Sequence, residues 1–253
     1  MPLPDRPRLC ILGDSHLSAP KRALDAGHAL GQRFEVELFG APGSAFRKID
    51  YVDGLFRCRD TETEEMVLKV NGQRRELPID AFDALLIYGA RLSSPRFFLP
   101  VLEALASPDH AMSAALLDLQ VRRFLSSFRT ITAARAIAAL GRHRVYVAPT
   151  PLYAWTEDPA HRSAELIQRH PGARLAEPAH RDRARALLCD AAAAEGVTLL
   201  FQPEDTITEG AFTHARWQQH PGDPLHMNAE FAGRLFDLLL AEEDRAAGAA
   251  DAA

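Results

Sequence analysis

This sequence of 253 residues has few cysteines, no excess of positive charge and no long apolar runs, and each of these features argues against a class of protein. The three cysteines, Cys10, Cys58 and Cys189, are odd in number and widely spaced, so neither a disulfide framework nor a zinc knuckle is expected. A formal net charge of -5 gives no electrostatic reason to bind nucleic acid or an anionic membrane. No apolar run approaches the roughly 18 residues of a membrane span, and no signal peptide is recognisable. We therefore expect a cytoplasmic protein with reduced thiols.

The chain instead alternates short apolar runs with helical stretches. Five stretches predict strands. Four are short apolar runs, Arg8–Gly13, Phe82–Tyr88, Arg144–Ala148 and Val197–Gln202, and the fifth, Phe34–Phe39, alternates apolar and acidic residues. Helical segments lie between most of these strands, and the longest, Pro108–Leu140, is expected to break near Ser126 and Ser127. This alternation predicts an α/β fold with a mainly parallel sheet and helices on both faces. In such sheets, ligands bind in the crevice beyond the carboxyl ends of the strands.

Residues 51–78 interrupt the alternation. Two stretches with β character, Tyr51–Arg57 and Glu65–Val70, are followed by Asn71-Gly72, a dipeptide typical of a hairpin turn. We expect a small inserted β-hairpin on the rim of the sheet, not a separate domain.

One domain is expected over residues 1–241. Its last helix is predicted to begin near Asn228, which is a good N-cap residue. Residues 242–253 are rich in Ala, Asp and Glu, and we expect them to form a disordered tail.

Two short motifs suggest a serine enzyme. Ser15 directly follows the first strand in GDSHL, where its hydroxyl would face the crevice; the alternative is that it only caps the next helix. In HPGDPLHMN, Asp223 precedes His226 by three residues, and a carboxylate at that spacing can orient an imidazole as in a serine triad. The alternative for this pair is a solvated surface loop. His220 is a rival base, but no carboxylate closely precedes it.

Taken together, the motifs resemble those of the SGNH (GDSL-like) hydrolase family. They are GDSHL after the first strand, GAPGS after the second, a Gly-containing loop after the third and D-x-x-H before the last helix. The resemblance covers nearly the whole chain in order. It implies a flavodoxin-like three-layer α/β/α sandwich with five parallel strands, and cleavage or transfer of acyl groups on esters. It implies no metal and no organic cofactor.

The resemblance also assigns roles to residues. Ser15 is similar to the family nucleophile, and Asp223 and His226 are similar to its acid and base. Gly43 in GAPGS is similar to the glycine whose backbone N–H joins that of Ser15 in the oxyanion hole, a role compatible with a turn glycine. The substrate would be a small-molecule or carbohydrate ester, as for an esterase, a lipase-like enzyme or a carbohydrate deacetylase. An O-acyltransferase on the same triad and a catalytically silent binding or accessory protein are the alternatives.

The third motif departs from the family pattern. In Gly89-Ala90-Arg91, Arg91 stands where the family usually has an Asn whose side-chain amide is the third oxyanion donor. Arg91 could donate to the oxyanion in place of that Asn. It could instead bind an anionic substrate group, pair with Asp14 or point into solvent. This departure from the family pattern is the reason for considering a catalytically silent binding or accessory protein.

A second resemblance starts at Asp14-x-His16, which is similar to the opening motif of calcineurin-like metallophosphoesterases. That family also needs G-D-x-x-D and G-N-H blocks, and the sequence contains neither, so we expect no metal site. Trp155 and Trp217 are expected to pack and not to form a substrate platform. Three arginines of one predicted helix are expected to form a solvated face: Arg181, Arg183 and Arg185.

Overall fold

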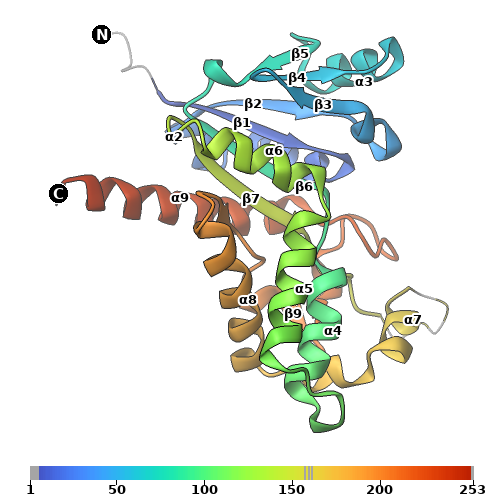
Figure 1. The fold of residues 1–253 in the computed structure, drawn as a ribbon. Coiled ribbons are helices and arrows are strands. Elements are labelled where there is room, and N and C mark those ends of the chain that lie inside the picture. Colours follow the sequence, from blue (N-terminus) through green and yellow to red (C-terminus); the bar gives the residue numbers. More distant parts are fainter. Residues whose placement is uncertain (1–5, 157, 159, 161, 252–253) are drawn as a thin grey trace.

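A computed structural model describes residues 6–156, 158, 160 and 162–251. Its centre is a five-stranded parallel sheet with the spatial order β2-β1-β6-β7-β8 (Figure 1). These strands are β1 (Arg8–Gly13), β2 (Glu35–Gly40), β6 (Ala84–Ser93), β7 (Arg144–Thr150) and β8 (Thr198–Leu199). This is the strand order of flavodoxin-like folds, so the predicted fold class is confirmed.

Both faces of the sheet are covered, which explains why its three inner strands, β1, β6 and β7, are mainly apolar runs. On one face, Leu9 and Ile11 of β1 pack in a core shared with α1 (Ser18–Asp25) and α9 (Ala229–Asp251). On the other face, Cys10 and Leu12 pack in a second core. The helices that contribute most to that second core are α4 (Pro95–Ala106), α5 (Ala114–Ser126), α6 (Arg129–Ala138) and α8 (Pro178–Ala193). The result is a three-layer sandwich.

The longest predicted helical stretch is interrupted. The stretch Pro108–Leu140 breaks at Ser127 and Phe128 between α5 and α6, as expected from the two adjacent serines. Two shorter helices are α2 (Leu30–Arg33) and α7 (Arg162–Arg169). A two-stranded antiparallel sheet of β9 (Ile207–Thr208) and β10 (Phe212–Thr213) lies after β8 in the sequence.

The prediction of a strand at Glu65–Val70 was wrong, because this segment belongs to helix α3 (Thr61–Asn71). Asp60 caps that helix by accepting a hydrogen bond from the N–H of Thr63 at 2.8 Å, and Thr63 and Val67 are buried at helical spacing. Gly72 is the C-cap of α3 and not part of a hairpin turn. A hairpin does form beside it, within a three-stranded antiparallel sheet of β3 (Ile49–Val52), β4 (Leu55–Cys58) and β5 (Glu76–Pro78).

The disordered tail expected at residues 242–253 also needs correction, since α9 continues to Asp251. Glu243 is buried, accepts a hydrogen bond from the hydroxyl of Tyr146 and pairs with Arg144 at 2.8 Å. These contacts tie the end of α9 to β7. Within the described part of the chain, no helix is both long enough and apolar enough to cross a membrane.

Candidate active site

The loop after β1 holds Ser15 on a rigid base. Asp14 caps a short 3-10 helix, Ser15–Leu17, by accepting a hydrogen bond from the N–H of His16 at 3.2 Å. The other carboxylate oxygen of Asp14 accepts the N–H of Arg91 at 3.2 Å, and Asp14 is buried. One carboxylate therefore joins the end of β1 to the end of β6. These neighbouring strands flank the point where the strand order of the sheet reverses, the usual place for a ligand.

A tight turn presents His226. The N–H of Asp223 donates to the C=O of His220 at 3.0 Å, with Pro-Gly at the centre of the turn. Gly222 has a φ of +84°, which a type II turn requires at this position. The chain then returns antiparallel to itself, and the N–H of Gln219 donates to the C=O of His226 at 2.9 Å. The order of residues in HPGDPLH thus fixes where the imidazole lies.

The structure brings the three predicted side chains together. His226 Nε2 lies 2.9 Å from Ser15 Oγ, and His226 Nδ1 lies 2.9 Å from Asp223 Oδ2. Because an ionised carboxylate only accepts hydrogen bonds, Nδ1 carries the proton and Nε2 is free to accept one from the serine. The ring of the rival base, His220, instead contacts the side chain of Gln219 at 3.3 Å. This arrangement can transfer a proton from serine to imidazole.

The carboxylate of Asp223 is kept ionised by its hydrogen bonds. Burial alone would raise the pKa of Asp223. The hydrogen bonds from the backbone N–H groups of Leu225 and His226 and from the His226 imidazole lower it by more, so the pKa lies below its usual value. A permanent negative charge at this place fixes the imidazole tautomer and would stabilise an imidazolium formed by protonation of Nε2.

A second imidazole supports the first. The ring of His16 stacks on that of His226, with centroids 4.9 Å apart and an angle of 37° between the planes. Burial lowers the pKa of His16 and outweighs the opposite effect of Asp14, so His16 is neutral at pH 7. On its other side, His16 fills the space beside Gly89, where an added Cβ would lie 2.8 Å from the ring. Only glycine fits there, and this contact explains the first residue of the third motif.

The segment after Tyr88 is an irregular part of β6, not the loop that we predicted. Gly89, Ala90 and Arg91 form a left-handed turn, with φ angles of +67°, +44° and +65°. Such a conformation costs a non-glycine residue about 1–3 kcal/mol. Asp14 offsets this cost by accepting the N–H of Arg91, and the hydroxyl of Thr130 donates to the C=O of Ala90 at 2.8 Å. Backbone strain of this kind is common at functional sites, and here it lies beside Ser15 and His226.

The two remaining oxyanion candidates differ in position. The side chain of Arg91 lines the same pocket as Ser15 and His226, and its Nε lies 3.9 Å from Asp14 Oδ2. Pairing with Asp14 is therefore the alternative that the structure shows for Arg91. Gly43 begins a 3-10 helix, Gly43–Lys48, and is not among the residues that line the pocket. Arg91 and Ser15 thus lie on the wall of the same pocket, whereas Gly43 is not on that wall.

A pocket of about 1190 Å³ opens beside Ser15 and His226. Its walls come from Ile49–Val52 of β3, from Phe56 of β4 and from residues at the start of α4 and in α6. Helix α6 lies beside β6 in the fold, with the insertion next to it (Figure 1).

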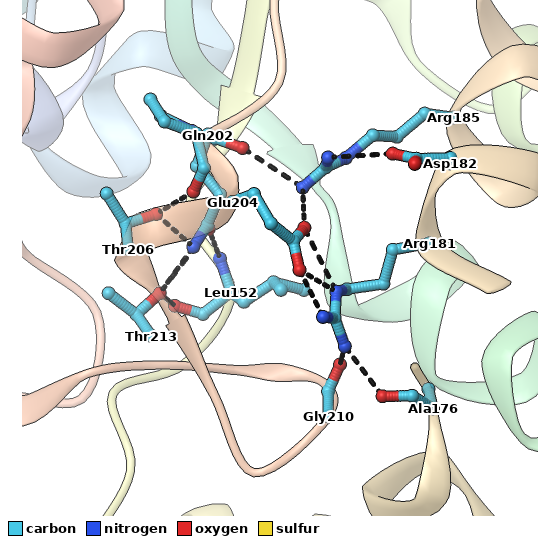
Figure 2. A network of polar contacts seen from close by, with 11 residues as sticks. Leu152, Ala176, Arg181, Asp182, Arg185, Gln202, Glu204, Thr206, Gly210 and Thr213 are labelled. Atoms are coloured by element: carbon cyan, nitrogen blue, oxygen red, sulfur yellow. Dashed lines mark hydrogen bonds and ion pairs between the residues drawn. The ribbon is translucent and has the colours of Figure 1, made fainter. Parts of the chain in front are cut away.

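The remaining predicted residues are structural. Trp217 is buried against Phe231, and Trp155 packs on Phe212, as expected. The expectation of a solvated face was wrong for Arg181, which is buried and donates to Glu204 and to the backbone C=O groups of Ala176 and Gly210 (Figure 2). Arg185 is partly buried in the same network, and Arg183 is exposed.

Sequence reasoning missed the positioning roles of Asp14 and His16, which it weighed only as a possible metal motif or a partner of Arg91. Among the residues that the structure describes, no three His, Cys, Asp or Glu side chains are grouped as metal ligands. No family model matches this chain, and no curated protein matches it in sequence.

Proposed function

We propose that this protein is a serine-dependent ester hydrolase of the SGNH type, with Ser15 as nucleophile, His226 as base and Asp223 as the orienting acid. The observation that supports this most strongly is the continuous chain of two 2.9 Å hydrogen bonds from Asp223 through His226 to Ser15. Its serine end lines a pocket large enough for a substrate. A hydroxyl that only caps a helix would need no base.

The chemistry follows from this geometry. Ser15 Oγ attacks the carbonyl carbon of the ester while His226 Nε2 takes the hydroxyl proton. The imidazolium then gives that proton to the leaving alcohol, and an acyl-enzyme remains on Ser15. A water molecule, deprotonated by His226, attacks the acyl carbon, and the acid is released as Ser15 Oγ takes that proton back from the imidazolium.

The tetrahedral oxyanion needs donors. Ser15 is the first residue of its 3-10 helix, so its N–H has no acceptor within that helix and is available to the oxyanion. Arg91, which lines the same pocket, supplies a charged donor if its guanidinium turns from Asp14. Gly43 stays a predicted donor without support from the pocket walls.

The pocket also favours a second candidate function, O-acyl transfer on the same triad. Its volume of about 1190 Å³ exceeds that of most small-molecule sites, so an acceptor alcohol fits beside the ester. We propose a small-molecule or carbohydrate ester as substrate. The protein would act in the cytoplasm, where its three free cysteines, Cys10, Cys58 and Cys189, stay reduced.

Hydrolysis of 4-nitrophenyl acetate tests the proposal. Ser15→Ala and His226→Ala should each lower kcat/KM by at least about 10³-fold, because each removes one of the two reacting groups. Ser126→Ala, which changes an exposed serine outside the pocket, is the matched control and should keep full activity. Equal turnover by the native protein and Ser15→Ala would rule out the esterase. Release of nitrophenol that accelerates with added alcohol, together with formation of the new ester, would favour acyl transfer.

A further inference from the structure

The pocket beside Ser15 is rich in positive charge, although the whole chain has a net charge of -5. Two aspartates line it, Asp14 and Asp50, and its described lining contains no glutamate and no lysine. Five arginines line it: Arg47, Arg91, Arg96, Arg129 and Arg169. A pocket with this excess attracts anions and concentrates them near the serine.

Three of these five arginines already have a carboxylate partner: Arg129 pairs with Asp50, Arg91 approaches Asp14 at 3.9 Å, and Arg169 pairs with Glu165. Asp50 pairs with Arg129 and with Arg59, whose Nη2 donates to it at 2.9 Å. Asp14 is buried and accepts the backbone N–H groups of His16 and Arg91. Both carboxylates therefore serve to hold the walls of the pocket together.

Two of the arginines are available to a ligand. Arg47 and Arg96 are exposed, and within the described residues neither forms an ion pair. Arg47 is held in place through its main chain, since its C=O accepts a hydrogen bond from Arg129 Nη1 at 2.8 Å. Arg96 is the second residue of α4. A guanidinium without a carboxylate partner in a pocket wall is suited to bind a carboxylate or phosphate.

The rest of the wall is apolar and aromatic. Phe46, Tyr51, Phe56 and Phe128 line the same pocket, together with Leu99. These side chains would cover the uncharged part of a ligand and exclude water from it, which strengthens an ion pair at its edge.

We propose that the substrate is an ester that carries a second, anionic group, a carboxylate or a phosphate, and that Arg47 and Arg96 bind this group while Ser15 attacks the ester. The inference rests on the proposed function for the place of the scissile bond and adds the class of substrate. Arg47 and Arg96 are specificity residues and take no part in the bond changes.

Two esters of equal acyl length provide the test: 4-nitrophenyl hydrogen glutarate, which carries a carboxylate, and 4-nitrophenyl valerate, which is neutral. The native protein should have a kcat/KM at least about tenfold higher for the glutarate ester. Replacing both arginines, in Arg47→Gln/Arg96→Gln, should remove that preference and change the valerate reaction by less than about twofold. Arg122→Gln, an arginine of α5 outside the pocket, is the control and should keep the preference. Inhibition by inorganic phosphate compared with acetate then identifies the preferred anion.

A binding experiment separates this inference from the proposed function. Calorimetry on Ser15→Ala, which cannot form the acyl-enzyme, should show a Kd at least about tenfold lower for the glutarate ester, and Arg47→Gln/Arg96→Gln should abolish the difference. Equal binding of the two esters would overturn the inference even where Ser15-dependent hydrolysis is found. A preference for the anion without any Ser15-dependent turnover would overturn the proposed function and leave the anion site.

Discussion

Two polar networks join distant parts of this chain, and they differ in what their side chains face. Ser15, Asp223 and His226 line or adjoin a pocket of about 1190 Å³, and the side chain of His226 is 27% exposed. The network of Arg181 and Glu204 (Figure 2) borders a space of only about 20 Å³, and the side chain of Arg181 is 9% exposed. That space is about the size of one water molecule. Only the first network has room for a substrate.

Satisfaction of hydrogen bonds also separates the two networks. Gln202, beside Arg181, uses its whole amide: Oε1 accepts the N–H of Leu152 at 2.7 Å, and Nε2 donates to the hydroxyls of Thr206 and Thr213 at 3.1 Å each. The bonds of Ser15, in contrast, end at a hydroxyl whose oxygen faces the pocket. A network in which every polar atom has a protein partner stabilises the fold, whereas one that ends at a pocket can do chemistry.

The largest effect should come from Asp223→Asn, which tests the chemical side of this contrast. An amide at this place can donate to Nδ1 and favour the wrong imidazole tautomer, so kcat should fall by about 10⁴-fold with little change in stability. Hydrolysis of 4-nitrophenyl acetate measures it. Asp205→Asn, which changes an exposed aspartate paired with Arg234, is the control. An Asp223→Asn protein with native activity would remove Asp223 from the mechanism.

A substitution in the network of Arg181 and Glu204 should change the stability of the protein and leave its activity unchanged. Arg181→Met leaves the C=O groups of Ala176 and Gly210 and part of Glu204 without their donor, and should lower the free energy of unfolding by about 2–4 kcal/mol. Urea unfolding measures this loss, and Arg183→Met, on the exposed side of the same helix, should change little. If folded Arg181→Met lost as much activity as Asp223→Asn, the two networks would not be separate.

A smaller effect, this time an increase in stability, is expected at Ala90, where the backbone is strained. Ala90→Gly should raise the free energy of unfolding by about 1 kcal/mol, because glycine adopts the φ of +44° at no steric cost. Ala115→Gly, at an exposed position of α5, should instead lower it by a similar amount. Urea unfolding compares them, and a loss of stability in Ala90→Gly would show that position 90 carries no strain.

The smallest effect concerns pH. The pKa of His16 is lower in the folded protein than in the unfolded chain, so the unfolded chain binds more protons as the pH falls through about 6.5. This contribution to stability is complete above that pH and is lost below it. His16→Leu should therefore lose less stability between pH 7 and pH 5 than the native protein, as measured by urea unfolding. His110→Leu, which changes an exposed histidine, should follow the native protein, and an equal slope in His16→Leu would contradict the assignment.

Local sequence patterns predicted most of the fold and the three side chains Ser15, Asp223 and His226. The apolar runs are buried on both faces, and GDSHL and HPGDPLH hold rigid local geometry, so both were visible in the sequence. The helix at Glu65–Val70 was missed because its β-branched residues resemble a strand, whereas a cap at Asp60 decides its structure. The burial of Arg181 depends on Glu204, 23 residues away, and no local pattern predicts that contact.

Labelling with a fluorophosphonate, followed by mass spectrometry of the peptides, tests the activated serine most directly. The native protein should take up one label per chain on Ser15, His226→Ala should take up none, and Arg183→Met should be labelled like the native protein. Absence of label from the native protein, or label on a residue other than Ser15, would contradict the account.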